Sequence, residues 1–468
     1  MNDRRKGRRS RARNGAALAL VVVLALVSAA CGGNRSTAKP ATTDAPAGSG
    51  GAQTTSTIID TSACPPNTGT TGVEGNTINI GTSLPQSGIY AAFAAILKGE
   101  QAYFNYVNAQ GGVPVAGKKY QIKLHAADDQ YIASQTFNNV QTMLNANKTF
   151  ALFNVVGTKN NLAIRQLVNA DCVPDLFAAS GATQWGNHAY PWLIGSELVP
   201  YPLEVKTFVD YLKKTKPTAT IAVLKANDDF GQSYADTLDQ LVKGTQLKVV
   251  KTEQYDSSGL PNVAPQVNSL AATHADAFLL AAALTACPAA LNAAGDANWH
   301  PITYMSGTCV SKILFDAAGK NANNVLTVTP LLDPADPANA SNAAMQLYKK
   351  QFAKDYPPTA TEPNDPKEGI SAYGWTTAAL FVKTLEAAKA LDRASVMESA
   401  RKMVNFSDVG LQIPAAKWNT NADDWFIGET YQFVKYDANA HHTVPVGPLT
   451  DEDGQTAALT PGNLINLK

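Results

Sequence analysis

From Asn76 onward, short runs of β-branched and apolar residues alternate with longer stretches in which apolar residues recur at helical spacing. Ile78 and Ile80 alternate as in a strand, and Ala91 to Asn108 then follows the periodicity of a helix. Phe150 to Val156 is almost continuously apolar, which is typical of a strand buried on both faces. This alternation predicts βαβ units around mostly parallel sheets, and therefore an α/β fold.

The same pattern begins again after Pro200 and Pro202, so we predict two Rossmann-like lobes. A length of 468 residues also exceeds what one core normally organises. A strand at Val325 to Thr329 is expected to lead the chain back toward the first lobe, and a late strand is expected at Tyr431 to Tyr436. Several crossings of this kind form a multi-strand hinge. The predicted bounds are 76–198 plus 330–428 for the first lobe, 199–329 plus 429–450 for the second, and 451–468 for a C-terminal tail.

The first thirty residues have the organisation of a signal peptide. Seven basic residues precede an apolar run from Ala16 to Ala30, which is shorter than the roughly 20 residues that span a bilayer. The small residues around Cys31 resemble a bacterial lipobox, although Ser28 stands where Leu or Val is usual. We predict lipidation of Cys31; a plain signal peptide and an uncleaved anchor are the alternatives.

Residues 31–75 are rich in Thr, Ser, Ala, Gly and Pro and are expected to form a lipid-anchored flexible linker. Without the seven basic residues and Asp3 of the signal peptide, the chain keeps 31 basic and 37 acidic residues, a net charge of −6. An acidic body has no attraction for phosphate backbones, so we predict no nucleic-acid partner.

Four cysteines follow Cys31, an even number in a compartment that permits disulfides. Three pairings of Cys64, Cys172, Cys287 and Cys309 are possible. Cys287 and Cys309 each follow a predicted strand in the same half of the chain, which favours their pairing and, by elimination, that of Cys64 with Cys172. No CxxC spacing indicates a metal site, and the adjacent histidines His441 and His442 are expected to be solvated surface residues.

Polar and small residues follow the predicted strands of both lobes. Ligands of open parallel sheets bind beyond the carboxyl ends of the strands, where helix N-termini offer free N–H groups. Glycine and hydroxyl residues there let a polar ligand approach the backbone, although turns and helix caps use the same residues. The segments are Ser83 and Gln86–Tyr90, Gly157–Thr158, Ser180–Thr183, Asn227–Gly231, Thr285 and Ser306–Thr308.

Motifs that would indicate an enzyme are missing from the sequence. It contains no GxSxG, no Walker A, no GxGxxG after a strand and no HExxH. The pairs Asp128–Asp129 and Asp228–Asp229 fit helix caps and loop acids better than acid/base catalysis. We therefore predict a protein without catalytic activity, cofactor or metal. Aromatic residues that are candidates for a pocket wall are Tyr90, Trp185, Tyr201, Phe230 and Tyr373.

From Asn76 to Asp437 the chain resembles the type I periplasmic-binding-protein fold, in particular the branched-chain amino-acid-binding family of ABC transporter receptors. The resemblance rests on these residues: Ile80–Gly81 leading to Leu84–Gly88, Asn108–Val113, Asp128–Asp129, Ser180–Thr183, Asp229–Gly231 and Ala372–Tyr373.

The resemblance implies a binding site between the lobes. Loop residues matching Gly157, Thr158 and Gly181 to Thr183 would hold a ligand carboxylate, and Phe230 would supply a ring from the other lobe. Thr308 stands where amino-acid binders carry an acidic residue for the ammonium group, so a carboxylate, an amide or another polar compound is an open alternative to an amino acid. The predicted ligand-binding residues are Ser87, Tyr90, Gly157, Thr158, Gly181, Ala182, Thr183, Phe230, Thr285, Thr308 and Tyr373.

The implied function is that of an extracytoplasmic solute-binding lipoprotein, a monomer that closes on its ligand and is recognised by membrane permease and ATPase subunits. Two alternatives stay open. The same fold serves as a ligand sensor that signals to a partner protein, and a secreted hydrolase would use the aspartate pairs.

Overall fold

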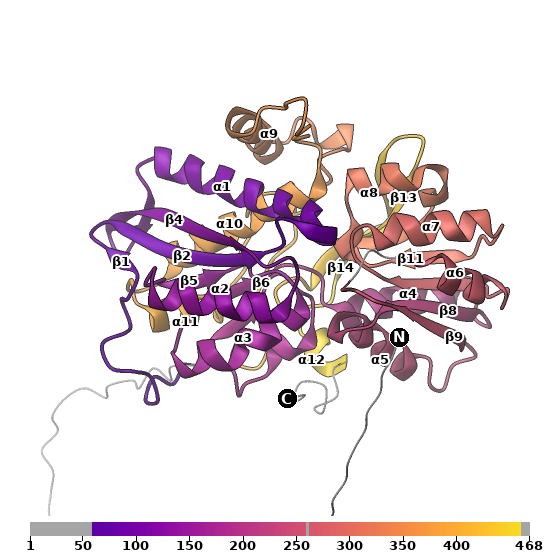
Figure 1. The fold of residues 1–468 in the computed structure, drawn as a ribbon, viewed down its shortest axis with the longest axis horizontal. Coiled ribbons are helices and arrows are strands. Elements are labelled where there is room, and N and C mark those ends of the chain that lie inside the picture. Colours follow the sequence, from indigo (N-terminus) through magenta and orange to yellow (C-terminus); the bar gives the residue numbers. More distant parts are fainter. Residues whose placement is uncertain (1–58, 259–261, 460–468) are drawn as a thin grey trace, which may run out of the picture. The chain divides into compact units, whose positions relative to one another are not determined.

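A computed structural model of the chain describes residues 59–258 and 262–459. The predicted signal peptide, the predicted lipidation site Cys31 and linker residues 32–58 lie outside these described residues. The described part forms two α/β lobes, each built on one seven-stranded sheet (Figure 1). The predicted fold class, two lobes with mostly parallel sheets, is confirmed.

The first sheet has the strand order β3-β4-β2-β5-β6-β7, with β1 paired to β2. Strands β4, β2, β5, β6 and β7 run parallel, and β1 and β3 pair antiparallel with their neighbours. Helices α1 and α10 cover one face, α2 and α3 the other, and α9 packs on α1. The strands are β1 (Val73–Glu74), β2 (Thr77–Leu84), β3 (Val113–Val115), β4 (Lys118–Asp128), β5 (Ala151–Phe153), β6 (Asp175–Ala178) and β7 (Leu193–Gly195). The helices are α1 (Ala94–Ala109), preceded by the 3-10 turn η1 (Gly88–Phe93), α2 (Ala133–Asn145), α3 (Thr158–Ala170), α9 (Ala343–Asp355), α10 (Gly369–Ala387) and α11 (Arg393–Ala400).

The second sheet has the order β14-β13-β12-β11-β10-β8-β9. Strands β9, β8, β10, β11 and β12 run parallel in this order across the sheet, and β13 and β14 add an antiparallel edge. Helices α4, α5 and α12 lie on one face, and α6, α7 and α8 on the other. The strands are β8 (Thr220–Ala226), β9 (Lys248–Tyr255), β10 (Ala277–Ala281), β11 (Ile302–Met305), β12 (Leu326–Thr329), β13 (Thr430–Asp437) and β14 (His442–Asp451). The helices are α4 (Tyr201–Thr215), α5 (Asp229–Leu241), α6 (Ala264–Ala271), α7 (Ala286–Asp296), α8 (Lys312–Ala318) and α12 (Gln455–Leu459).

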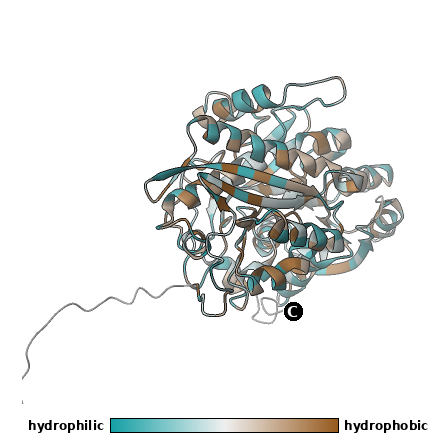
Figure 2. Ribbon diagram, turned by 60° about the vertical axis from the view of Figure 1, so that its left-hand side comes forward, coloured by the Kyte–Doolittle hydropathy of each residue, from teal (hydrophilic) through white to brown (hydrophobic). Residues whose placement is uncertain are grey.

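Hydrophobic residues gather in the strands, and hydrophilic residues lie on the outer helix faces (Figure 2). The sequence pattern does not predict α3, because its buried face carries Asn160, Asn161 and Arg165 beside Ile164 and Val168. Polar side chains on the inner face hide the apolar periodicity that identifies a helix. Strand β14 also escapes prediction. It contains two prolines, which only an edge strand accepts.

Three segments carry the chain between the lobes: 196–200, 330–342 and 401–429. The first and third pack backbone against backbone at Gly428. A Cβ atom there would lie 2.3 Å from the carbonyl oxygen of Glu197 and 2.4 Å from that of Leu198. Only glycine permits this approach, so the two crossings form one closely packed hinge.

Both ends of the described chain are attached to the lobes. Residues 59–75, part of the predicted linker, lie on the first lobe: Ile59 is buried and Cys64 forms a disulfide with Cys172. In the predicted tail, α12 packs on α4 and buries Thr456. The second disulfide joins Cys287 to Cys309. Both pairs are those favoured by the sequence.

A buried polar network lies beneath the first crossing. Asn154 Nδ2 donates to Glu100 Oε1 (2.7 Å), and the Tyr373 hydroxyl donates to Asn154 Oδ1 (2.9 Å). Thr377 Oγ1 donates to Glu197 Oε1 (2.6 Å). Among the described residues, Glu100 Oε2 and Glu197 Oε2 find no hydrogen-bond partner. Two carboxyl groups so placed favour their neutral, protonated forms.

Burial raises the pKa of three glutamates: Glu100 to about 8, and Glu197 and Glu204 to about 7 each, from about 4.5. Between about pH 4.5 and 8 the folded protein therefore holds protons that the unfolded chain has lost. The contribution of these protons to the free energy of unfolding is complete below about pH 4.5, and it is lost as the pH rises to about 8. We predict that the free energy of unfolding, measured by urea denaturation, falls over this interval.

Glu100→Gln keeps the side-chain shape but cannot ionise, so it should make the fall shallower and leave the variant more stable than the native protein at pH 8. Gln at the exposed Glu74 is the control and should leave the slope unchanged. An unchanged slope in Glu100→Gln would contradict the prediction.

Candidate functional site

The strand ends of the two lobes meet through tyrosine side chains. The Tyr255 hydroxyl at the end of β9 accepts from the backbone N–H of Ala283 (3.2 Å), and Tyr90 of the first lobe lies beside it. Tyr201 of the second lobe reaches Ser180 of the first lobe, with its hydroxyl 3.4 Å from Ser180 Oγ. The two predicted loop sets therefore face one another, and the lobes are closed at this edge.

In the first lobe, the loops after β5 and β6 lie side by side, as the sequence predicts for a carboxylate cradle. Thr158 Oγ1 and Ser180 Oγ lie 2.8 Å apart, and both residues are buried. Gly157 precedes α3 with φ at 106°, a conformation that favours glycine. Gly181, Ala182 and Thr183 follow Ser180, with Ala182 N–H donating to Ser180 Oγ (3.2 Å).

The protein's own tyrosines occupy this cradle. The Tyr201 hydroxyl donates to Ser180 Oγ (3.4 Å), and a Cβ atom on Gly181 would lie 2.8 Å from the Tyr201 ring. A Cβ atom on Gly157 would lie 2.5 Å from the ring of Tyr131. These glycines make room for side chains of the same chain. Small residues alone cannot tell such packing from room for a ligand, so the sequence did not identify Tyr131 or Tyr255.

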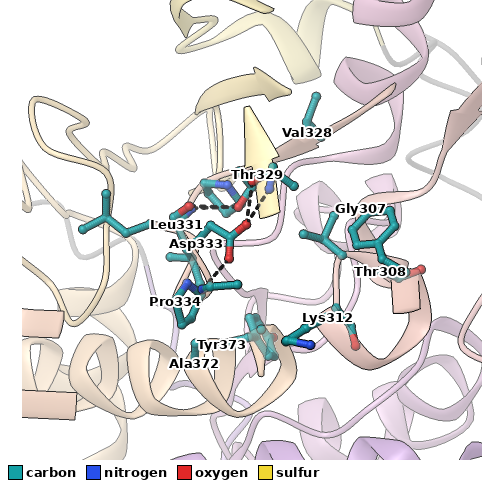
Figure 3. A pocket seen from close by; sticks show the side chains of 18 of the residues that line it. Gly307, Thr308, Lys312, Val328, Thr329, Leu331, Asp333, Pro334, Ala372 and Tyr373 are labelled. Atoms are coloured by element: carbon teal, nitrogen blue, oxygen red, sulfur yellow. Dashed lines mark hydrogen bonds between the residues drawn. The ribbon is translucent and has the colours of Figure 1, made fainter. Parts of the chain in front are cut away.

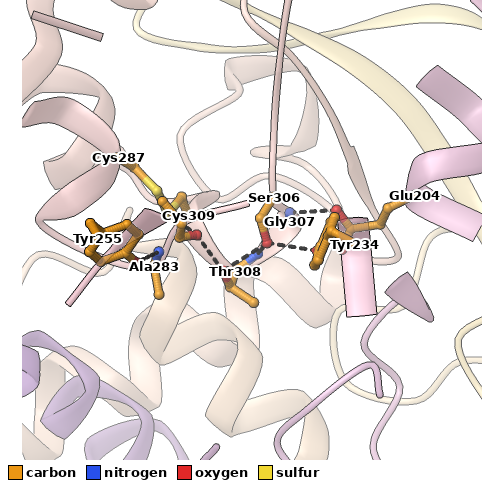
Figure 4. The surroundings of a disulfide bond; sticks show 10 residues. Glu204, Tyr234, Tyr255, Ala283, Cys287, Ser306, Gly307, Thr308 and Cys309 are labelled. Carbon is orange, nitrogen blue, oxygen red and sulfur yellow. Dashed lines mark hydrogen bonds between the residues drawn. A yellow bond between two sulfur atoms is a disulfide. The ribbon is translucent and has the colours of Figure 1, made fainter. Parts of the chain in front are cut away.

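In the second lobe, the Cys287–Cys309 disulfide joins the loops after β10 and β11 (Figure 4). Ser306 Oγ lies 2.8 Å from the Tyr234 hydroxyl and 2.9 Å from Thr308 Oγ1. The backbone N–H of Gly307 donates to Glu204 Oε2 (2.9 Å). The loop that carries Thr308 is thus held by a disulfide on one side and by hydrogen bonds on the other.

A cavity of about 70 Å³ lies between the lobes, next to the tyrosines. The turn η1, helix α1, the ends of β5 and β6, the first crossing, the Thr308 loop and the start of α10 all line it. The lining residues are Phe93, Ile96, Val156, Ala179, Leu198, Gly307, Thr308, Val310, Gly369, Ile370 and Tyr373. The walls come from both lobes and from the hinge, as a closed binding site requires.

A second space, of about 80 Å³, adjoins the first on the hinge side (Figure 3). The two spaces share six residues, among them Thr308 and Tyr373. In Figure 3, Ala372 and Tyr373 of α10 form one wall, and residues 328–334 of β12 and the second crossing form another. Its outer end is polar: Lys312, Asp333 and His441 line it.

Of the eleven predicted ligand-binding residues, Thr308 and Tyr373 line the cavity. Ser87 and Thr285 are exposed, and Ser87 Oγ hydrogen-bonds Asp128. The remaining predicted residues are buried where the lobes meet, beside the cavity: Tyr90, Gly157, Thr158, Gly181, Ala182, Thr183 and Phe230.

The aspartate pairs bind backbone groups. Asp128 Oδ1 accepts from Gln86 N–H (2.8 Å), Asp129 accepts from Tyr131 N–H (2.8 Å), and Asp228 caps α5 through Gly231 N–H (3.1 Å). These contacts are those of helix caps and loop acids, the role that the sequence favours for the aspartate pairs over acid/base catalysis.

In the part of the chain that the structure describes, one group of carboxylates is close enough to hold a cation. Oxygen atoms of Asp424, Glu429 and Asp453 lie within 4.8 Å of one another at the end of the third crossing. Glu429 accepts from the N–H groups of Gly454 (2.7 Å) and Thr456 (2.8 Å). Burial and the neighbouring Asp424 raise the pKa of Glu429 to about 8. The two amide donors and the protonated form that a raised pKa favours stabilise Glu429 in this buried position.

No helix in residues 59–258 and 262–459 is long and apolar enough to cross a membrane.

Solved structures with the same fold include several solute receptors. The chain superposes on a branched-chain amino acid ABC transporter protein from Thermus thermophilus with bound valine at a TM-score of 0.70, with 14% identity, covering 81% of this chain and 97% of that one. The fatty acid ABC transporter substrate-binding protein from Thermomonospora curvata gives 0.68 and 20%, covering 83% and 95%. A solute-binding protein from R. palustris in complex with benzoate gives 0.64 and 16%, covering 80% and 98%.

Residues 77–441 match the family described as "Periplasmic binding protein". That match includes both sheets apart from β1 and β14, and every residue of the interlobe cavity. The chain belongs to the periplasmic binding protein family.

Proposed function

We propose that this protein is the lipid-anchored, extracytoplasmic solute receptor of an ABC transporter, and that it captures a small carboxylate or amide by closing its lobes. The observation that carries the proposal is the cavity walled by both lobes and the hinge. A ligand there touches each lobe only when they are closed, so its binding favours the closed form.

The contacts between the lobes suit a reversible closure. At the strand ends the Tyr201 hydroxyl of the second lobe donates to Ser180 Oγ of the first lobe (3.4 Å). Glu368, before α10, accepts across the boundary from Ile313 N–H of α8 (3.1 Å). Each contact is a single hydrogen bond, worth about 0.5–1.5 kcal/mol net. A few such bonds can be opened and remade when a ligand enters.

The similar structures support an organic acid as ligand. Valine, the fatty acid and benzoate named for them share a carboxyl group and differ in the rest of the molecule. We propose permease and ATPase subunits as partners of the closed monomer, and no catalytic step. We also propose the lobe bounds expected from the sequence, with residues 59–75 added to the first lobe and α12 to the second.

Small molecules released by denaturing the native protein should contain one organic acid or amide, chemically unchanged, as identified by mass spectrometry. Deleting the gene should abolish cellular uptake of that compound. Normal uptake with a lost cellular response would instead indicate a sensor. Recovery of a cleaved compound would indicate a hydrolase.

Tyr90→Phe removes the hydroxyl that lies beside Tyr255 of the other lobe, so the closed form should lose one polar interlobe contact. We predict a Kd for the released compound about 2- to 10-fold weaker by calorimetry. The radius of gyration in solution at fixed ligand concentration should also increase. Tyr120→Phe on β4 is the control. Equal affinity and compactness in Tyr90→Phe would exclude this contact from closure.

Cys31→Ser removes the thiol that a diacylglyceryl group would modify. The full-length variant should move from the membrane to the soluble extracytoplasmic fraction on immunoblots, whereas Ser36→Ala should stay with the membrane. Retention of Cys31→Ser in the membrane fraction would contradict the lipid anchor. It would not bear on the binding function, which the uptake measurement tests.

A further inference from the structure

We infer that the ligand is a molecule with an apolar body and no cationic group, an aliphatic or aryl monocarboxylate or its amide, rather than a zwitterionic amino acid. The inference rests on the proposed function and narrows the ligand class of the same cavity.

The cavity offers nothing that would pair with an ammonium ion. Among the eleven described residues that line it, none carries a charged side chain. Its two side-chain hydroxyls are engaged within the protein: Tyr373 donates to Asn154, and Thr308 Oγ1 lies 2.9 Å from Ser306 Oγ and 3.4 Å from the carbonyl oxygen of Ala282. A cation buried here would lose its hydration without gaining a counter-charge, whereas the carboxyl or amide end of a ligand whose body lies here can extend into the adjoining space, which Lys312 and His441 line.

The two carboxylates of the adjoining space are already bonded within the protein. Glu204 and Asp333 line the adjoining hinge-side space. Glu204 Oε2 accepts from Gly307 N–H (2.9 Å) and the Tyr304 hydroxyl (3.0 Å). Asp333 Oδ2 accepts from the N–H and the hydroxyl of Thr443, both at 2.8 Å. Drawing either acid toward an ammonium group would break these bonds.

The two spaces together suit an extended hydrocarbon. The hinge-side space continues the apolar wall with Val199, Phe315, Val328 and Leu331, and it joins the cavity along the shared residues. The polar end of an amino acid has no alternative place in the cradle, because Tyr201 and Tyr131 fill it. An apolar body is therefore the part of a ligand that the closed lobes can bury favourably.

The test compares three probes that share one carbon skeleton: L-leucine, 4-methylpentanoate and 4-methylpentanamide. The mature chain, freed of bound ligand by reversible denaturation, is titrated with each by calorimetry at pH 7.5. We expect the acid and the amide each to bind at least tenfold more tightly than leucine. Leucine binding as tightly as either, or no probe binding at 10 mM, would overturn the inference.

A substitution that adds a charge to the cavity wall tests whether the ligand binds in this cavity. Thr308→Glu adds a carboxylate to the wall and should shift the ratio of 4-methylpentanoate to leucine affinity at least tenfold toward leucine. Thr308→Gln, of similar size and neutral, should keep the native preference. Thr142→Glu on the exposed side of α2 controls for added charge. Thermal unfolding checks that each variant is folded.

If Thr308→Glu is folded and leaves the ratio unchanged, the ligand body does not occupy this cavity and the inference fails. Failure of this inference can be distinguished from failure of the proposed function. A preference for leucine would refute the ligand class but keep a solute receptor, whereas normal uptake after gene deletion would refute transport and leave the measured preference standing.

Discussion

The contact of Tyr201 with the first lobe is the interaction on which the closed structure depends. Tyr201 is the first residue of α4, directly after the first crossing, and it belongs to the second lobe by sequence. Its hydroxyl nevertheless hydrogen-bonds Ser180 in the first lobe, and its ring packs on Phe230 in the second. One side chain thus joins the hinge, the strand-end loops of the first lobe and the aromatic residues of the second.

This arrangement moves the free space of the cleft toward the hinge. With the loop cradle filled by Tyr201 and Tyr131, the remaining cavity lies among Val156, Leu198, Val310 and Tyr373, and its walls are mostly apolar. Three acidic side chains of this region are buried within the protein. Glu100, Glu197 and Glu204 are buried with raised pKa values and bind protein groups. In this structure apolar surfaces of both lobes therefore meet around the cavity, while the acids bind groups of the hinge and its neighbours.

Much of the fold could be predicted because strand and helix periodicities differ and are readable locally. The alternation at Ile78 and Ile80 and the apolar run from Phe150 to Val156 predict strands, and the structure has β2 and β5 there. Helix α3 could not be read, because Asn160, Asn161 and Arg165 occupy its buried face. The predicted ligand-binding residues identified part of the candidate site. The strand-end loops do face one another, but only Thr308 and Tyr373 of the predicted residues line the cavity.

By itself the sequence determined the two α/β lobes and the favoured cysteine pairing, since these follow from local periodicity and from the positions of Cys287 and Cys309 after predicted strands in the same half of the chain. Only the tertiary structure decided what fills the gap. A glycine in a loop allows close approach by any group, and whether that group is a ligand or a tyrosine from 20 or more residues away depends on how distant segments pack.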